Sequence, residues 1–187
     1  MQSLTTEAII IAQWQARECD RWVRFVSPHL GLTEGRAISA LATKSKLGPH
    51  LLTYHSVRLT VISGRSSRRI IGARQSENLP DNSLPVVALW CAVLERLSPR
   101  QPKDEKLFDI LKTLYSRINC ETDRKSLSNE ALLGLATLFA YFGFIPWSSP
   151  ILKKPNLALI EEALFAIIER PMPAWEYFKK SEGFFRL

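Results

Sequence analysis

The sequence lacks the residue patterns that usually identify enzymes, metal sites and disulfide-stabilised folds. Its three cysteines, Cys19, Cys91 and Cys120, are widely spaced with no C-x-x-C pair, which argues against both a disulfide framework and a tetrahedral zinc site. Its three histidines show no spacing typical of metal ligands on one helix face. It has no phosphate-binding glycine loop, nucleophile elbow or closely spaced acidic pair. The sequence therefore predicts a binding protein without a cofactor rather than an enzyme.

Long hydrophobic runs are also missing. The most apolar stretch, "ALLGLATLFAYFGFIP", is shorter than the roughly 18 residues that a membrane-spanning helix needs. The short apolar run at residues 8–12 has no basic segment before it, so no signal peptide is evident. These features predict a soluble protein of the cytoplasm.

The positive charge is distributed unevenly along the chain. Of the formal net charge of +7, residues 1–80 contribute +6, with 11 Lys and Arg against 5 Asp and Glu, and residues 81–187 contribute +1, with 14 against 13. An excess of cations in one part of a chain is typical of proteins that bind a polyanion. The N-terminal half is therefore the candidate nucleic-acid-binding region.

Residues 1–80 alternate between apolar and polar positions, as half-buried strands do. The pattern predicts five strands, at residues 7–14, 20–27, about 32–40, 54–62 and 68–75. In the fourth strand Val57, Leu59 and Val61 are expected to face the core, and in the first Trp14 is expected to pack there too. Five short strands separated by turn residues are typical of an OB-fold, a small Greek-key barrel.

Helical spacing replaces the alternation after the linker "QSENLPDNSLP". Helices are expected at residues 85–97, 107–118, 129–142 and 156–167, the last of them capped by Asn156. Pro171 and Pro173 are expected to end the fourth helix and leave a short aromatic tail. Cys91 falls in an apolar stripe and is expected in the core. The predicted fold class is α+β: an OB-fold domain at residues 1–80 and a helical domain at residues 81–187.

Several cations of the predicted barrel are candidate phosphate ligands. In an OB-fold the loops after strands 1 and 4 flank the ligand face, and the loop after strand 4 reads "SGRSSRR". The candidate DNA-binding residues are Arg21, Arg24, Lys44, Lys46, Arg58, Arg65, Arg68, Arg69 and Arg74. Trp22 and Tyr54 are candidates for base stacking. The alternative for any single arginine is a solvated strand edge that discourages aggregation.

Several segments, taken in order, resemble the RecO family of bacterial DNA repair proteins. "TEAIII", "ECDR", "FVSPHLG" and "SKLGPHLLTYHSVRLTVISGR" are similar to successive family patterns over residues 5–74, and "LFAYFGFIP" is similar to a segment of the family's helical domain. The resemblance implies an OB-fold followed by helices. It also implies a recombination mediator, not an enzyme, that binds single- and double-stranded DNA, anneals complementary strands and is cytoplasmic and nucleoid-associated. The implied partners are RecR and the C-terminal tail of single-strand-binding protein, with RecA loading as the outcome. Lys46 and Arg65 fall within matching motifs.

The sequence departs from the family pattern at two places. A basic stretch of the Ala-Lys-Gly-x-Arg-Lys type is replaced by "AISALATKSKL", and the four-cysteine zinc site of many members is replaced by "WSSPILKKP". No zinc is therefore expected. The loss of the basic stretch leaves two alternatives open: an adaptor that has lost DNA binding and acts through protein contacts, and an RNA-binding OB protein, which charge alone does not distinguish.

Overall fold

The computed structural model describes residues 3–64, 67–77, 79–98, 104–120, 123–168 and 172–180. The chain forms two compact units: residues 1–79 with 99–110, and residues 80–98 with 111–187. The division into domains at residues 80 and 81 stays a prediction.

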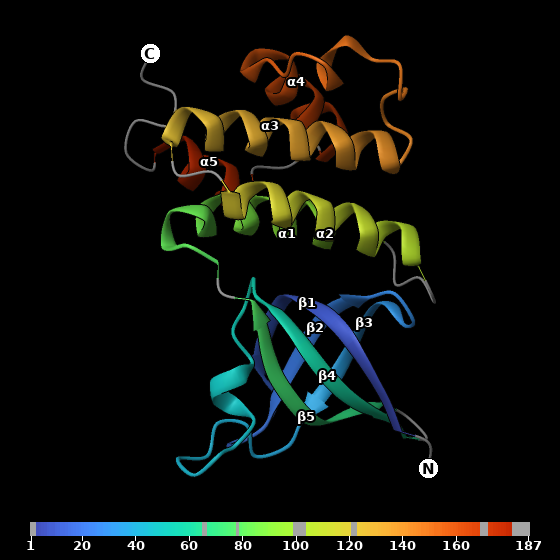
Figure 1. Ribbon diagram of the computed structural model, residues 1–187, viewed down its shortest axis with the longest axis vertical. Helices are drawn as coiled ribbons and strands as arrows, with labels where there is room; N and C mark the ends of the chain where they lie inside the picture. The colour runs from blue at the N-terminus through green and yellow to red at the C-terminus, as the bar shows by residue number, and fades with distance from the viewer. Residues whose placement is uncertain are drawn as a thin grey trace. The chain divides into compact units, whose positions relative to one another are not determined.

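The first unit contains a closed five-stranded barrel (Figure 1). Its strands are β1 (Ser3–Gln15), β2 (Arg21–Ser27), β3 (Gly31–Ala37), β4 (Ser56–Ser63) and β5 (Arg68–Glu77). They are ordered β1-β2-β3-β5-β4 around the barrel. The β3–β5 pair is parallel and the other pairs are antiparallel. This arrangement confirms the predicted α+β class with an N-terminal OB-fold.

Apolar side chains from all five strands fill the barrel. Val57, Leu59 and Val61 of β4 face this core, as the alternation predicts, and Val23 and Phe25 of β2 are fully buried there. The segment between β3 and β4 contains a short 3-10 helix (Gly48–His50), and its Leu51 is buried in the same core.

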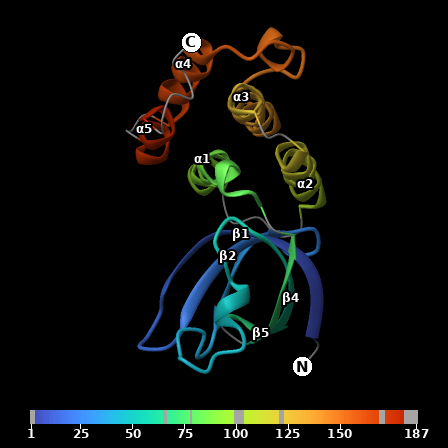
Figure 2. The ribbon, with the colours of Figure 1, turned by 60° about the vertical axis from the view of Figure 1, so that its left-hand side comes forward.

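The expectation that Trp14 packs in the core is wrong, because β1 contains a bulge. The long strand β1 curves around the barrel (Figure 2), and its register with β2 shifts between Ile10 and Ala12. Ile10 lies opposite the buried Phe25, whereas Ala12 lies opposite Arg24. One extra residue reverses the faces of the positions that follow it. Trp14 is therefore on the outer surface, with 40% of its area exposed.

The helices follow the predicted order. They are α1 (Leu84–Leu97), α2 (Glu105–Cys120), α3 (Arg124–Tyr141), α4 (Leu157–Ile168) and α5 (Pro173–Lys180), with short 3-10 helices at Asp81–Ser83 and Pro150–Leu152. Side-chain oxygens of Asp104, Asp123 and Asn156 accept backbone N–H hydrogen bonds at the starts of α2, α3 and α4, which satisfies donors that a helix start leaves unpaired. The predicted cap at Asn156 is confirmed. Among the described residues, no helix is long and apolar enough to cross a membrane.

The second unit packs α1 closely against α3. Trp90 of α1 is fully buried and donates its indole N–H to the carbonyl oxygen of Ala131, 3.0 Å away. A Cβ at Gly134 would lie 2.3 Å from the Trp90 ring, so only glycine fits beneath this indole. Cys91 is 2% exposed, which confirms it as a core residue, and burial raises the pKa of its thiol.

The expected aromatic tail is instead a helix. Pro173 is the first residue of α5, a position where proline is favourable because its missing N–H would have no partner there. Trp175 and Phe178 are buried, with their rings stacked at 6.0 Å between centroids. The Trp175 indole N–H donates to Glu161 Oε1 of α4 over 3.1 Å. The prediction failed because it treated Pro173 only as the end of the preceding helix; Pro171 lies outside the described residues.

Candidate nucleic-acid interface

A row of two tryptophans and two arginines runs across the outer face of the barrel. Trp14 of β1 lies opposite Trp22 of β2, Trp22 lies opposite Arg36 of β3, and Arg36 lies beside Arg69 of β5. We call these four residues the Trp–Arg row. Neighbouring strands are about 4.8 Å apart, so the row extends over about 14 Å. The row lies between the β1–β2 and β4–β5 loops, which flank the ligand face of OB-folds.

Arg24 lies next to the row and is held by an acidic partner. It is directly opposite Glu34 in the β2–β3 register, and its Nε donates to Glu34 Oε1 over 2.9 Å. The guanidinium group of Arg24 also lies over the Trp14 ring, 5.3 Å from the centroid, within the range of a cation–π interaction. Glu34, Arg24 and Trp14 thus form a chain of contacts across three strands.

Arg36 is similarly held by Asp20, at the end of the β1–β2 loop. Arg36 donates to Asp20 Oδ2 through Nε, at 2.9 Å, and through Nη2. The other carboxylate oxygen of Asp20 accepts the N–H of Ser39, at 2.8 Å. These hydrogen bonds, that from Ser39 first, hold the pKa of Asp20 below its ordinary value of 3.8. Asp20 therefore stays ionised and orients one end of Arg36.

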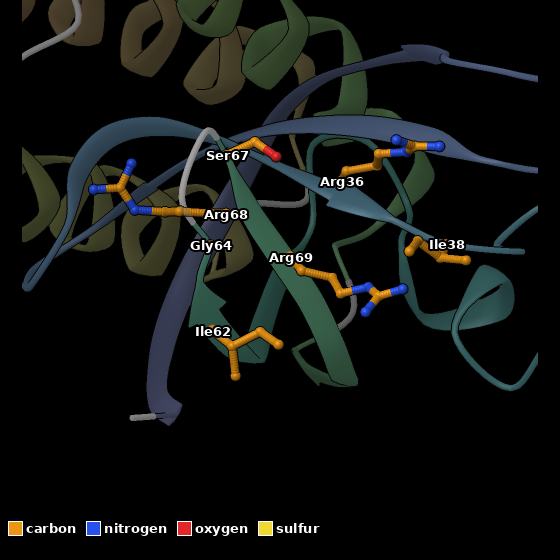
Figure 3. A pocket seen from close by; sticks show the side chains of 7 residues that line it. All are labelled: Arg36, Ile38, Ile62, Gly64, Ser67, Arg68 and Arg69. Atoms are coloured by element: carbon orange, nitrogen blue, oxygen red, sulfur yellow. The ribbon is translucent and has the colours of Figure 1, made fainter. Parts of the chain in front are cut away.

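A pocket of about 200 Å³ opens where β3, β4 and β5 meet. It is lined by Arg36, Ile38, Ile62, Gly64, Ser67, Arg68 and Arg69 (Figure 3). Arg36 and Arg69 extend toward the same side of the sheet, whereas Arg68 extends the other way. Two guanidinium groups adjacent in register repel each other, and an anion between them would relieve that repulsion.

Arg68 belongs to the pocket but points toward the barrel. Its Nη1 donates to Thr33 Oγ1 over 2.7 Å, and its buried Nε has no hydrogen-bond partner. Arg65, which the sequence places in the same loop, lies outside the described residues.

The other predicted cations lie away from the Trp–Arg row. Arg58 of β4 lies opposite both Glu7 of β1 and Arg74 of β5. Both arginines are exposed, but Arg74 is five residues beyond Arg69 along β5, about 17 Å of strand. They form a second cationic site, which we call the Arg58–Arg74 site.

Lys44, Lys46 and Arg21 are placed separately from both arginine groups. The two lysines are exposed in the β3–β4 segment on either side of Ser45, whose hydroxyl oxygen accepts the N–H of Gly48. Arg21 donates to Gln13 Oε1 at 2.7 Å and to the Leu51 carbonyl at 3.3 Å, so it ties the barrel strands to that segment. The candidate cations therefore fall into several groups, and the structure does not gather them into one row.

The two candidates for base stacking differ in position. Trp22 is half-buried within the Trp–Arg row. Tyr54 lies just before β4, where it adopts a positive φ of 70° and its N–H donates to the Ile10 carbonyl over 2.7 Å. Tyr54 therefore lies where β1 meets the start of β4, and it is not part of the Trp–Arg row.

The sequence does not predict two members of the row. The alternation places Trp14 in the core, because the bulge at Ile11 leaves no clear mark on it. Arg36 was not singled out, although it alternates with the buried Gly35 and Ala37 on β3. That alternation was the available signal, and it was weak because β3 is rich in small residues.

Within the part of the chain that the structure describes, no group of three or more His, Cys, Asp or Glu side chains is placed to share a metal ion. The outward-facing side chains of the Trp–Arg row are cationic and aromatic, which are groups that can bind anions and flat rings.

Comparisons with known proteins point in one direction. No protein-family model matches the chain. Three curated relatives named DNA repair protein RecO do match, all from Dehalococcoides mccartyi. The proteins of strains CBDB1 and BAV1 are each 33% identical over 113 residues, which is 57% of this chain and 44% of the relative. The protein of strain 195 is 26% identical over 122 residues, which is 63% of this chain and 48% of the relative.

The match is partial, because the aligned region spans less than half of each relative's length. The chain is nevertheless similar to bacterial RecO proteins, and the resemblance indicated by its own motifs is confirmed.

Proposed function

We propose that this chain acts in DNA repair and recombination as a RecO-like mediator that binds DNA through the outer face of its barrel. The observation that carries the proposal is the adjacency of Arg36 and Arg69 on parallel strands, both lining a 200 Å³ pocket. Guanidinium groups form forked hydrogen bonds with phosphate oxygens. A backbone phosphate between the two arginines would accept hydrogen bonds from both of them and reduce their mutual repulsion.

The aromatic half of the Trp–Arg row supports a nucleic acid as the anion. Trp14 and Trp22 continue the line of Arg36 and Arg69 across the sheet. A ligand lying along the row would meet rings at one end and positive charge at the other, as bases and phosphates require. Binding of this kind is independent of sequence and depends strongly on salt.

The helical unit is proposed to contact protein partners. Phe144, Trp147, Leu159 and Phe165 are exposed there, with Trp147 at 53%, and exposed apolar side chains are frequent where a partner docks. RecR and the tail of single-strand-binding protein, the partners implied by the resemblance, belong to this proposal, as do strand annealing, recombinase loading and a nucleoid-associated place in the cytoplasm. The chain acts by binding and not by catalysis.

The test is a salt titration of binding to a fluorescein-labelled single-stranded oligonucleotide, followed by fluorescence anisotropy. Affinity should fall steeply as salt rises, and Arg69→Gln should reduce the slope of log K against log salt by about 0.7, the value for one phosphate on a single strand. Arg74→Gln, which removes an exposed arginine from the same strand outside the pocket, is the matched control and should leave the slope unchanged. Weak binding that does not respond to salt would overturn the proposal.

A second candidate function is a protein adaptor with little DNA binding. It is favoured by the pairing of arginines with carboxylates: Arg24 is bonded to Glu34 and Arg36 to Asp20. With Arg69, three arginines face two carboxylates, which leaves one net positive charge on this face. Recovery of RecR or single-strand-binding protein in a pull-down, together with no mobility shift of labelled DNA, would select the adaptor. Parallel titrations with matched DNA and RNA oligomers test the RNA alternative.

A further inference from the structure

Trp14 has the properties of a ligand-contacting ring and not of a core residue. It is 40% exposed, on the outer face, although its strand also contributes the buried Ala8, Ile9, Ile10 and Ile11. The bulge between Ile10 and Ala12 turns this large indole outward. Bulges often occur where a strand re-aims a side chain for function.

Arg24 holds this ring in place. Its guanidinium lies over one face of Trp14 at 5.3 Å from the centroid, while Glu34 accepts its hydrogen bonds from the other side. Glu34 is only 15% exposed at the side chain and Arg24 only 25%. The pair is thus partly withdrawn from water and fixes the guanidinium by a forked contact to one carboxylate oxygen.

Because Arg24 covers one face of the Trp14 ring, a flat ligand would stack on the opposite face. A duplex presents its bases stacked on each other, so only an unpaired base offers a free ring to such a surface. Trp22 lies beside Trp14 on the next strand, and Arg36 follows. The chemistry along this line is ring, ring, cation, which matches a single strand and not a double helix.

We infer that Trp14 stacks on an unpaired nucleobase and that Arg24, held by Glu34, is a positioning residue for Trp14 and not a phosphate contact. This inference rests on the proposed function, because it assigns roles within the same DNA-binding face. It reassigns Arg24, which charge alone places among the phosphate ligands, and it adds a stacking residue.

The experiment measures binding of the full chain to a fluorescein-labelled oligo-dT and to a blunt duplex of equal length over a range of salt. Trp14→Ala should weaken single-strand binding by about 5- to 150-fold, the range for loss of one base stack, without changing the salt slope. Duplex binding should change much less. Trp14→Phe, which keeps a ring, should restore most of the affinity.

A double variant tests the role of Arg24. Arg24→Gln with Glu34→Gln keeps the net charge and leaves no unpaired carboxylate. It should weaken single-strand binding by about 2- to 5-fold, as loss of a cation–π contact implies, at an unchanged salt slope. Added to Trp14→Ala, it should cause no further loss, because Arg24 acts through Trp14.

The outcomes are separable. If the wild-type chain binds no DNA, both the proposed function and this inference are overturned. If wild type binds and Trp14→Ala binds equally well, the stacking role alone is overturned. If the double variant lowers the salt slope by about 0.7, or weakens Trp14→Ala further, Arg24 contacts phosphate and its positioning role is wrong. Thermal unfolding of each variant by circular dichroism verifies that it is folded.

Discussion

Two arginine pairs on the same barrel differ in what surrounds them. In the Trp–Arg row, Arg36 and Arg69 lie on parallel strands, line a pocket and continue a line of tryptophans. In the Arg58–Arg74 site, the arginines lie on antiparallel strands with Glu7 next in register. The charge count of the N-terminal half treats these four residues alike. Charge alone therefore does not distinguish the two pairs, whereas the pocket and the tryptophans accompany only Arg36 and Arg69.

One arginine of the row is fixed in place by a carboxylate. Arg36 is anchored by Asp20, whose other oxygen is bonded to Ser39 N–H at 2.8 Å. An anchored guanidinium loses less side-chain entropy when it meets a phosphate. The anchoring carboxylate also cancels charge, so the row depends on geometry more than on net charge.

Charge reversal should separate the two pairs most strongly. Arg36→Glu with Arg69→Glu should weaken single-strand binding by at least about 10-fold at low salt, because two phosphate contacts become repulsive. Arg58→Glu with Arg74→Glu makes the same change in net charge and should weaken binding by less than about 3-fold. Fluorescence anisotropy measures both. Equal losses would mean that only net charge matters and that the row is not the site.

The sequence predicts most of the fold because each unit repeats one simple period. Alternation in β4 places Val57, Leu59 and Val61 in the core, and helical spacing with a capping Asn156 locates α4. These signals are local, and the structure agrees with them. The bulge in β1 is the exception, because a single added residue reverses the exposure of Trp14 without disturbing the apolar content of the strand.

The candidate site was harder to predict because it depends on register between distant residues. Asp20 reaches Arg36 across 16 positions, and Arg68 reaches Thr33 across 35. No composition or spacing rule identifies which carboxylate will neutralise which arginine. The distinction between Arg69 and Arg74 likewise arises from the short parallel pairing of β5 with β3, which includes Arg69 but not Arg74, and from a shift in the β4–β5 register between Ile70 and Gly72.

Replacement of glycine by alanine should show that side chains are packed more closely around Gly35, at the β3–β5 pair, than around Gly72, at the β4–β5 pair. A Cβ at Gly35 would lie 2.9 Å from Ile70 Cγ1 in the buried core, so Gly35→Ala should lower the free energy of unfolding by about 1–3 kcal/mol. Gly72→Ala meets the half-exposed Thr60 at 3.1 Å, a contact that a shift of a few tenths of an ångström relieves, and should cost under about 1 kcal/mol. Urea unfolding measures both; a larger loss at Gly72 would contradict this ranking.

Acid should weaken the anchoring of Arg36 by Asp20. The pKa of Asp20 is held below 3.8 by Ser39 and Arg36, so its contribution to stability is present above about pH 4 and is lost as pH falls through the lowered pKa. Asp20→Asn should therefore be less stable than wild type at pH 6, and the gap should narrow toward pH 2. Urea midpoints at several pH values measure it. If the difference in stability between wild type and Asp20→Asn did not change with pH, the charge of the Asp20 carboxylate would not be what stabilises the β1–β2 loop.

The smallest expected difference is between two variants that each lose one threonine hydroxyl group, Thr33→Val and Thr60→Val. Thr33 accepts a 2.7 Å hydrogen bond from Arg68 and is 8% exposed, whereas Thr60 shares a 3.1 Å hydrogen bond with Thr5 on the exposed surface. Thr33→Val should lower the free energy of unfolding by about 1 kcal/mol, because it removes an acceptor from a guanidinium whose Nε already lacks a partner. In Thr60→Val, water can replace the lost hydroxyl as the hydrogen-bond partner of the exposed Thr5, so the free energy of unfolding should change by less than about 0.5 kcal/mol. If the two variants prove equal in urea unfolding, Arg68 is bound no more firmly than a surface side chain, and it is then free to turn toward the pocket as a third phosphate ligand.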